Sequence, residues 1–325
     1  MDFQVKVLGL SFIITLIISM IVIPLLRRLK IGQIERDDGP RSHLKKQGTP
    51  TMGGIIMMLT SIIVCIGIYF YYRTKEPDVA NHLLPMLLLT LGFGLIGLID
   101  DFKKLVLKNT KGLSPTAKMI GLLIISVAYT LYLTNILHIG TDIYIPFAKI
   151  YISLPIWLYV PLAILVMLST TNAINLTDGI DGLSSSVTTI ILTALTVIAI
   201  VFDVKEATIF GSMLAGTCLG FLVFNLYPAK VMMGDTGSLM LGGAVAAISL
   251  YLKMPFILLI LAIVPILETL SVIIQVSYFK KTGNRVFKMA PLHHHFELSG
   301  WKENKVVTIF SCITLIACII GVWAI

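Results

Sequence analysis

Charged residues are scarce in this sequence, at 13% of 325 residues, whereas hydrophobic residues make up 57%. Soluble domains usually carry about 25% charged residues. The mean hydropathy of +0.93 agrees with this imbalance. The scarcity of charge therefore excludes an ordinary soluble domain and indicates an integral membrane protein.

A cysteine framework is also missing. The four cysteines all lie within apolar runs and form no CxxC pair, which argues against both a disulfide scaffold and a zinc site. The sequence contains no internal repeat and no low-complexity linker, and aromatic residues do not interleave with its basic loops. We therefore expect a single integral membrane domain over residues 1–325 and no nucleic-acid partner.

Long apolar runs account for most of the chain. A transmembrane helix needs about 20 mostly apolar residues, and ten runs approach this length: 5–26, 51–72, 82–99, 114–136, 153–171, 182–202, 207–226, 238–252, 255–278 and 305–325. They predict an all-α integral membrane protein with about ten transmembrane helices. The segment 137–152 alternates enough to predict a short outer hairpin.

The run 255–278 is the least uniformly apolar, because Glu268 lies about halfway along it. A charge at the bilayer centre costs roughly 2.5–3.5 kcal/mol on insertion scales. We therefore expect Glu268 to face protein, and this span to be bent or tilted.

Basic residues set the predicted orientation. The connections after odd-numbered runs hold 19 of the 25 lysines and arginines, and the opposite side holds 6. By the positive-inside rule, both termini face outward and the basic loops face the cytoplasm. The net charge of +8 also predicts attraction to anionic membrane lipids.

Acidic residues gather where apolar runs end, and by the parity of the runs these ends all face the cytoplasmic side: Asp100, Asp101, Asp178, Asp181 and Asp235. Ionisable groups near membrane depth are costly and usually mark function. Adjacent helical residues point about 100° apart, so Asp100 and Asp101 are predicted to have different roles. Solvated interfacial caps are the alternative interpretation.

The loop 224–238 combines a carboxylate with a glycine-rich turn. Gly234 and Gly237 flank Asp235, and Thr236 and Ser238 could cap the helix that follows. Such a turn presents backbone N–H groups to an anion, and the carboxylate would repel that anion unless a divalent cation bridged them. Magnesium fits, because it accepts one or two carboxylates together with phosphate oxygens and water. A plain capped turn is the alternative.

Two further segments carry polar residues. In NAINLTDGIDG (172–182), Asp181 is predicted to cap the following helix, whereas Asn175 and Asp178 have no evident structural role. The three consecutive histidines of LHHHFELSGW (292–301) cannot easily converge on one metal, because zinc sites use spaced ligands. Hydrogen bonding to a sugar or phosphate suits them better, with solvated loop histidines as the alternative.

Five segments, in order along the chain, are similar to one family: DGPRSHLKKQGTPTMGG (38–54), LIDDFKK (98–104), TTNAINLTDGIDGL (170–183), FNLYPAKVMMGDTGS (224–238) and MAPLHHHFELSGW (289–301). They resemble the phospho-N-acetylmuramoyl-pentapeptide transferases, a branch of the polyprenyl-phosphate N-acetylhexosamine-1-phosphate transferase superfamily. The resemblance implies transfer of phospho-MurNAc-pentapeptide from UDP-MurNAc-pentapeptide to undecaprenyl phosphate, giving lipid I and UMP. It also implies a Mg²⁺ cofactor and a site on the cytoplasmic face of a bacterial plasma membrane; a homodimer is compatible with it.

The resemblance also assigns roles. Asp235 would be the metal ligand, and Asp100, supported by Asp101, would deprotonate or orient the lipid phosphate. An aspartate that attacks first, forming a covalent intermediate, stays open. The implied catalytic set is Asp100, Asp101, Asp178, His293, His294 and His295, with the histidines at the sugar–phosphate portion. The implied substrate-binding set is Lys46, Thr51, Asn175 and Asp181 at the nucleoside, Asn225 at the metal loop, and Lys104 and Lys118 at the pyrophosphate.

Other classes fit less well. A transferase for a UDP-N-acetylhexosamine without the peptide would not need the triple histidine or GTPTMGG (48–54). A transporter or lipid flippase would show repeated halves and charges within spans, and only Glu268 fits. A purely structural membrane protein leaves the aspartates unexplained.

Overall fold

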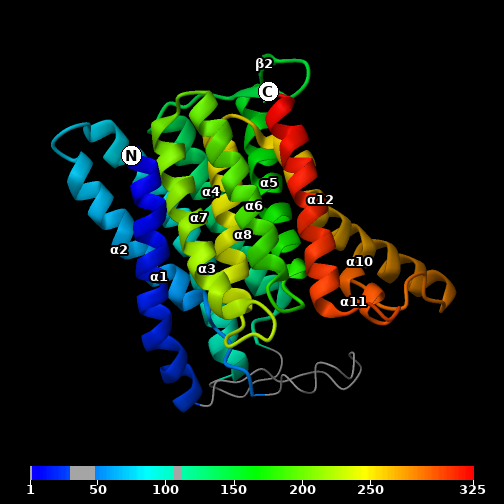
Figure 1. Ribbon diagram of the computed structural model, residues 1–325. Coiled ribbons are helices and arrows are strands. Elements are labelled where there is room, and N and C mark those ends of the chain that lie inside the picture. Colours follow the sequence, from blue (N-terminus) through cyan, green and yellow to red (C-terminus); the bar gives the residue numbers. More distant parts are fainter. Residues whose placement is uncertain (1, 30–47, 106–111) are drawn as a thin grey trace.

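The computed structural model describes residues 2–29, 48–105 and 112–325. Within these ranges, ten long helices form one bundle (Figure 1): α1 (Phe3–Arg28), α2 (Gly54–Tyr72), α3 (Pro77–Leu105), α4 (Pro115–Asn135), α5 (Ile156–Thr177), α6 (Leu183–Val201), α7 (Lys205–Asn225), α8 (Gly234–Tyr251), α10 (Ile263–Thr282) and α12 (Glu303–Trp323). Nine of them, all except α8, are long and apolar enough to cross a membrane, in the part of the chain that is described. The prediction of an all-α multi-pass membrane protein is confirmed.

Helix α8 lies in the middle of the bundle (Figure 1) and packs most extensively against α3 and α5. It has only 18 residues, and every residue from Thr236 to Tyr251 is buried. The run 238–252 therefore does form a helix at the predicted place. Its surroundings are other helices rather than lipid, which is why it tolerates a polar first turn.

The predicted span 255–278 is interrupted. A 3₁₀ turn, η2 (Pro255–Ile257), and one turn of helix, α9 (Leu258–Leu261), precede α10. Ala262, with φ −96° and ψ 28°, leaves helical geometry and separates α9 from α10. Helix α10 then leans away from the bundle (Figure 1). Glu268 is fully buried, so both the bend and the protein-facing acid are confirmed.

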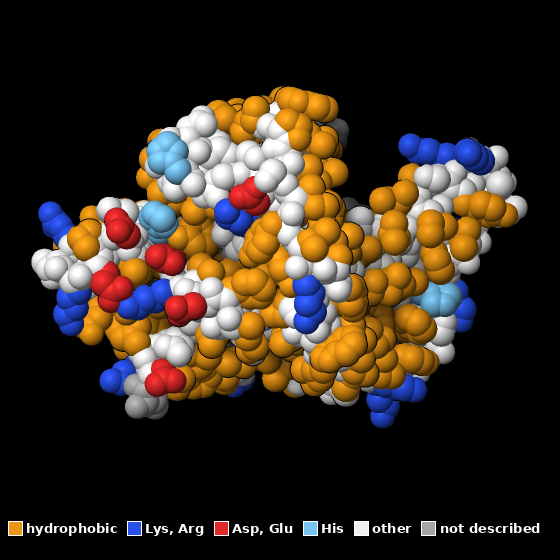
Figure 2. All heavy atoms as spheres, turned by 90° about the horizontal axis from the view of Figure 1, so that it is seen from above, with side chains coloured by type: hydrophobic (Ala, Val, Ile, Leu, Met, Phe, Trp, Pro, Cys, Tyr) orange, Lys and Arg blue, Asp and Glu red, His pale blue; other side chains and the backbone are white. Residues whose placement is uncertain are grey.

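The predicted hairpin is present. Strands β1 (Asp142–Ile145) and β2 (Ile150–Ser153) pair antiparallel, with Asp142 opposite Ser153. The N–H of Tyr144 donates to the Lys253 carbonyl and the N–H of Phe147 to the Ala324 carbonyl, so the hairpin is tied to the ends of α8 and α12. Figure 1 places it at the same end of the bundle as both termini. Viewed from that end, hydrophobic side chains dominate the surface (Figure 2).

The orientation prediction gives a labelling experiment. In a cysteine-free background, single cysteines introduced at Ser299 and at Lys149 should react with an impermeant reagent from opposite sides of the membrane. The two positions lie at opposite ends of the bundle. Lys149 is in the hairpin, at the end with both termini, whereas Ser299 lies just after α11 (Leu292–Glu297), before α12 begins. Labelling of both positions from the same side would contradict the orientation.

Candidate active site

The five aspartates meet at one end of the bundle, opposite both termini. Asp100 and Asp101 lie in the last turns of α3, Asp178 and Asp181 in the α5–α6 connection, and Asp235 in the first turn of α8. Helix α3 continues to Leu105, past the expected end at residue 99, so the aspartate pair belongs to the helix. The structure thus brings together the acidic residues that the parity of the runs places on one side.

Two lysines connect Asp100 with Asp235. The Nζ atom of Lys104 lies 2.8 Å from Asp100 Oδ2 and 3.0 Å from Asp235 Oδ2. Lys118 Nζ, from α4, lies 2.9 Å from the same Asp235 oxygen and 3.7 Å from Asp100 Oδ2. The Leu113 N–H also donates to Asp100 Oδ1, at 2.6 Å. The result is a compact cluster of two carboxylates and two ammonium groups at the C-terminal end of α3.

Asp101 has a different task from its neighbour, as the helical geometry predicts. Its carboxylate accepts hydrogen bonds from the N–H groups of Asp235 (3.2 Å) and Thr236 (2.9 Å) and from Thr236 Oγ1 (2.6 Å). It therefore caps the N-terminus of α8 from another helix, where a negative charge also interacts favourably with the helix dipole. The predicted caps are wrong in this respect, because Thr236 donates to Asp101 and Ser238 donates to the Gly234 carbonyl.

Close backbone contacts fix the position of this first turn. A Cβ on Gly97 of α3 would lie 2.2 Å from the Asp235 carbonyl oxygen, and one on Gly54 would lie 2.1 Å from Gly237 N. The N–H groups of Gly53 and Gly54 donate to the carbonyls of Met232 and Met233. The backbone of the GTPTMGG segment thus holds the turn that carries Asp235 in place through hydrogen bonds.

Asparagines hold the remaining sides of the turn. Asn175 Nδ2 donates to Asp235 Oδ1 at 2.9 Å and to Ser238 Oγ at 2.8 Å. Asn225 is buried, donates to the Val231 carbonyl at 3.0 Å and accepts from Ser185 Oγ at 2.6 Å. Asn175 therefore contacts the proposed metal ligand directly, while Asn225 shapes the loop that leads to it. Thr51 lies beside this turn, since its Oγ1 would be 3.1 Å from a Cβ on Gly234.

Asp181 is not the N-cap of α6. That position belongs to Gly182, in the left-handed conformation at φ 76°. Asp181 instead accepts a hydrogen bond from the Ala229 N–H at 2.9 Å, and its own N–H donates to Glu303 Oε1 at 2.6 Å. It therefore links the α5–α6 connection to the α7–α8 loop and to the start of α12.

Asp178 follows the last residue of α5 and is half-buried. Burial, followed by the negative charges of Asp235 and Asp101, raises the pKa of Asp178 to about 8. The raised pKa favours the protonated form of Asp178, which can donate a hydrogen bond to a ligand.

This raised pKa predicts a stability effect. An unfolded aspartate has a pKa of about 3.9, so between about pH 4 and pH 8 the unfolded chain loses a proton that the folded chain keeps, and folding becomes less favourable as pH rises. Asp178→Asn removes this effect and should raise the thermal unfolding midpoint at pH 8 relative to the parent, with the difference narrowing toward pH 5.

Asp142→Asn is the matched control, because hydrogen bonds from Ser153 and Lys253 lower the pKa of Asp142. That substitution should lower the unfolding midpoint at neutral pH. Thermal unfolding of the detergent-solubilised variants between pH 5 and pH 9 measures both. Equal midpoints for parent and Asp178→Asn across this range would contradict the expected result.

The three histidines lie on α11 and have different polar partners, although the ring centroids of His293 and His294 are 4.1 Å apart. His293 is fully buried beside Glu268 of α10. His294 Nδ1 is 3.0 Å from Glu297 Oε2, and His295 Nδ1 accepts from the Lys288 N–H at 3.1 Å. As predicted, the side chains do not converge on one point. Only His294 and His295 have any exposed surface.

Asp235 and Asp100 offer carboxylate oxygens of the kind that Mg²⁺ takes, and a substrate phosphate would have to complete the shell of such an ion. Among the residues described, no three His, Cys, Asp or Glu side chains are grouped to hold a metal unaided. Two carboxylates, however, converge on the Lys104 ammonium, so a cation at this point is stabilised by both. Mg²⁺ takes one or two carboxylates and completes its shell with phosphate oxygens and water. Asp235 and Asp100 could therefore hold Mg²⁺ once a phosphate is bound.

Sequence reasoning missed two residues at this end of the bundle, Glu303 and Ser185. A glutamate in the first turn of a helix is ordinary, because it interacts well with the helix dipole, and a serine within an apolar run is inconspicuous. No local pattern singles either of them out. Lys46, assigned to the nucleoside pocket by resemblance, lies outside the described residues.

Comparison with known proteins shows the family of this chain. Residues 83–253 match the family described as glycosyl transferase family 4. The chain is 50% identical over 324 residues to a phospho-N-acetylmuramoyl-pentapeptide-transferase of Acetivibrio thermocellus, covering 99% of this chain and 95% of the relative. Proteins of the same name from Clostridium botulinum (50% over 312 residues, 96% and 93% covered) and Halalkalibacterium halodurans (47% over 314 residues, 97% and 95% covered) are also similar. The chain therefore belongs to the phospho-N-acetylmuramoyl-pentapeptide transferase family.

Proposed function

We propose that this protein transfers phospho-MurNAc-pentapeptide from UDP-MurNAc-pentapeptide to undecaprenyl phosphate, forming lipid I and releasing UMP. The observation that carries this proposal is the cluster of Asp100, Asp235, Lys104 and Lys118 at one end of an apolar bundle. Such a cluster suits a reaction between a phosphate anchored in the membrane and a soluble diphosphate. The names of the relatives point to the same reaction.

Positioning and charge neutralisation account for most of the catalysis in phosphoryl transfer. Lys104 and Lys118 are placed to release Asp235 and bind the phosphate oxygens of the substrates. Asp235 and Asp100 would then hold Mg²⁺, which neutralises charge on the diphosphate when bound. Asp100 would orient or deprotonate the lipid phosphate, and Asp101 keeps Asp235 in place through the cap of α8.

An apolar groove supports the lipid acceptor. Helices α5 and α10 border a cavity of about 230 Å³ lined by Val166, Thr170, Ala173, Pro265, Ile266 and Leu270 among others. Ala173 lies two residues before Asn175, which contacts Asp235. A polyprenyl chain in this groove would have its phosphate near the cluster. With the basic loops on the cytoplasmic side of a bacterial plasma membrane, the soluble donor would approach from the cytosol.

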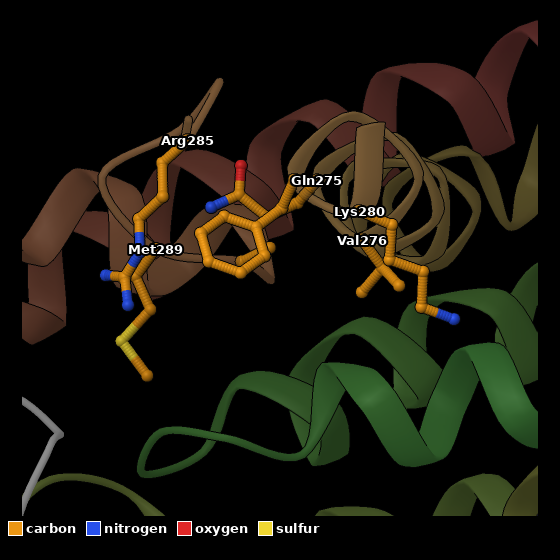
Figure 3. A pocket seen from close by; sticks show the side chains of 7 residues that line it. Gln275, Val276, Lys280, Arg285 and Met289 are labelled. Carbon is orange, nitrogen blue, oxygen red and sulfur yellow. The ribbon is translucent and has the colours of Figure 1, made fainter. Parts of the chain in front are cut away.

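A basic pocket beyond α10 supports a large anionic donor. Its volume is about 300 Å³, and Gln275, Val276, Phe279, Lys280, Arg285, Met289 and Ala290 line it. Figure 3 shows Arg285 and Met289 reaching from the loop on one side, Val276 and Lys280 on the side of α10, and Gln275 between them. Two cationic side chains beside an apolar wall suit a peptide with carboxylates, which a bare N-acetylhexosamine lacks.

Release of UMP by the purified protein tests the proposal. With undecaprenyl phosphate as acceptor, we expect UDP-MurNAc-pentapeptide to be used at least about 100-fold more efficiently than UDP-N-acetylglucosamine, since lost polar contacts commonly cost this much. Arg285→Ala should raise KM for the pentapeptide donor, whereas Lys149→Ala, in the distant hairpin, should not. Comparable turnover of both donors would move the protein to the neighbouring branch of transferases.

A further inference from the structure

Helix α10 carries two polar side chains, Glu268 and Gln275, that are seven residues, or two turns, apart and share one face. Both reach the segment that follows the helix. Gln275 Oε1 accepts from the N–H groups of Val286 (3.0 Å) and Phe287 (2.9 Å), and its Nε2 donates to the Phe287 carbonyl. Gln275 therefore holds the loop before α11 onto α10.

Glu268 makes the corresponding contact with α11 itself. Its Oε1 accepts from the His293 N–H at 3.2 Å and also lies 3.2 Å from His293 Nδ1. Both side chains are 0% exposed. Burying a carboxyl group within an apolar helix is costly. Oε1 of Glu268 has the partners just described, whereas Oε2 has no hydrogen-bond partner among the described residues. A substrate cannot reach it.

The imidazole of His293 transmits this contact to the aspartate cluster. A Cβ built on Gly179 would lie 2.1 Å from His293 Nε2 and 2.7 Å from Cε1. The ring therefore packs directly on the backbone next to Asp178. Gly179 does not have a positive φ, so what requires glycine here is the close approach of the ring.

We propose that Glu268 is a positioning residue for donor binding: it holds His293 against Gly179 and thereby sets where Asp178 and α11 lie in the site. The identity of the donor rests on the proposed function, but the contact itself does not. Because α10 also borders the apolar groove, Glu268 joins the helix beside the lipid acceptor to the loop beside the donor.

Substitutions at Glu268 test this proposal by separating KM from kcat. Glu268→Ala removes the acceptor and should raise KM for UDP-MurNAc-pentapeptide, and Kd for UMP, by roughly 10-fold or more, with little change in KM for undecaprenyl phosphate. Glu268→Gln keeps an acceptor oxygen and should recover most of the affinity. Ser271→Ala is the matched control, because the Ser271 hydroxyl donates to the backbone carbonyl of Glu268, within the same helix, and not to its carboxyl group.

A double substitution tests the contact with Gly179. Gly179→Ala places a methyl group where the His293 ring lies, so it should weaken UMP binding as Glu268→Ala does. In a His293→Ala background the space is free, and the same Gly179→Ala change should then have little additional effect on Kd. Equal effects in both backgrounds would overturn the proposed contact.

Hydrogen exchange gives a readout that needs no substrate. Amides of residues 292–298 and 176–182 should exchange faster in Glu268→Ala than in the parent, and at near-parental rates in Glu268→Gln. Unchanged exchange in Glu268→Ala would refute the positioning role even if the parent uses a different donor. Faster exchange together with an inactive parent would instead refute the proposed function alone.

Discussion

Asp235→Asn should lower the rate of UMP release by about two orders of magnitude or more. The substitution keeps the shape of the side chain, and its amide can still contact Asn175, but it removes the charge that faces Lys104 and Lys118 at 3.0 and 2.9 Å. A neutral amide would hold Mg²⁺ poorly, so the residual activity should need a higher Mg²⁺ concentration. Initial rates measured over a Mg²⁺ titration would show both effects.

Asp203→Asn is the matched control for this experiment, because Asp203 lies between α6 and α7 at the opposite end of the bundle. That variant should keep the parental rate and the parental Mg²⁺ dependence. If Asp235→Asn behaved like the control, the metal would have to be held elsewhere.

Asp100→Asn should abolish transfer while leaving Kd for UMP within about twofold of the parent, which is the pattern expected for a group that acts mainly in the transition state. Asp100 binds Lys104 at 2.8 Å and the Leu113 N–H at 2.6 Å, whereas Asn175 contacts the other carboxylate oxygen of Asp235, Oδ1. The second pKa of a phosphate is about 6, so orientation of the lipid phosphate should contribute more than proton removal. Single-turnover rates and equilibrium binding separate the two effects.

The alternative role for Asp100 is direct attack on the diphosphate. Incubation of the parent with UDP-MurNAc-pentapeptide and Mg²⁺, but without lipid acceptor, should release no stoichiometric UMP and leave no label on the protein. Detection of a phosphorylated or glycosyl-phosphoryl aspartate by mass spectrometry would reverse this assignment.

The helices could be predicted from the sequence, because membrane spans are recognisable by their length and hydropathy. Counting the spans also predicted that the end of α3, the end of α5 and the start of α8 lie on the same side. The hairpin likewise followed from alternation. The interruption at Ala262 has a local signal that the prediction did not use, because Pro265 lacks the N–H that would bond the Leu261 carbonyl and is tolerated best in the first turn of a helix.

The residues of the site could be predicted more readily than their partners. Asp100, Asp235, Lys104 and Lys118 were all assigned, but their convergence on shared atoms depends on how α3, α4 and α8 approach one another. Asp101 caps α8 through Asp235 and Thr236, which follow it in the sequence by 134 and 135 positions. Glu268 and His293 form a buried contact between two different helices, α10 and α11. Local sequence rules describe caps within one segment, so neither of these two contacts could be predicted from the sequence.

Helix α8 also has a consequence for biogenesis. Among the long helices described, it alone is not apolar enough along its length to count as a membrane span. Its polar first turn is satisfied by Asp101 of α3, a helix synthesised earlier, so we expect insertion of α8 to depend on α3. Insertion of α8 and assembly of the carboxylate cluster would then be coupled, because both need the contact between Asp101 and the first turn of α8.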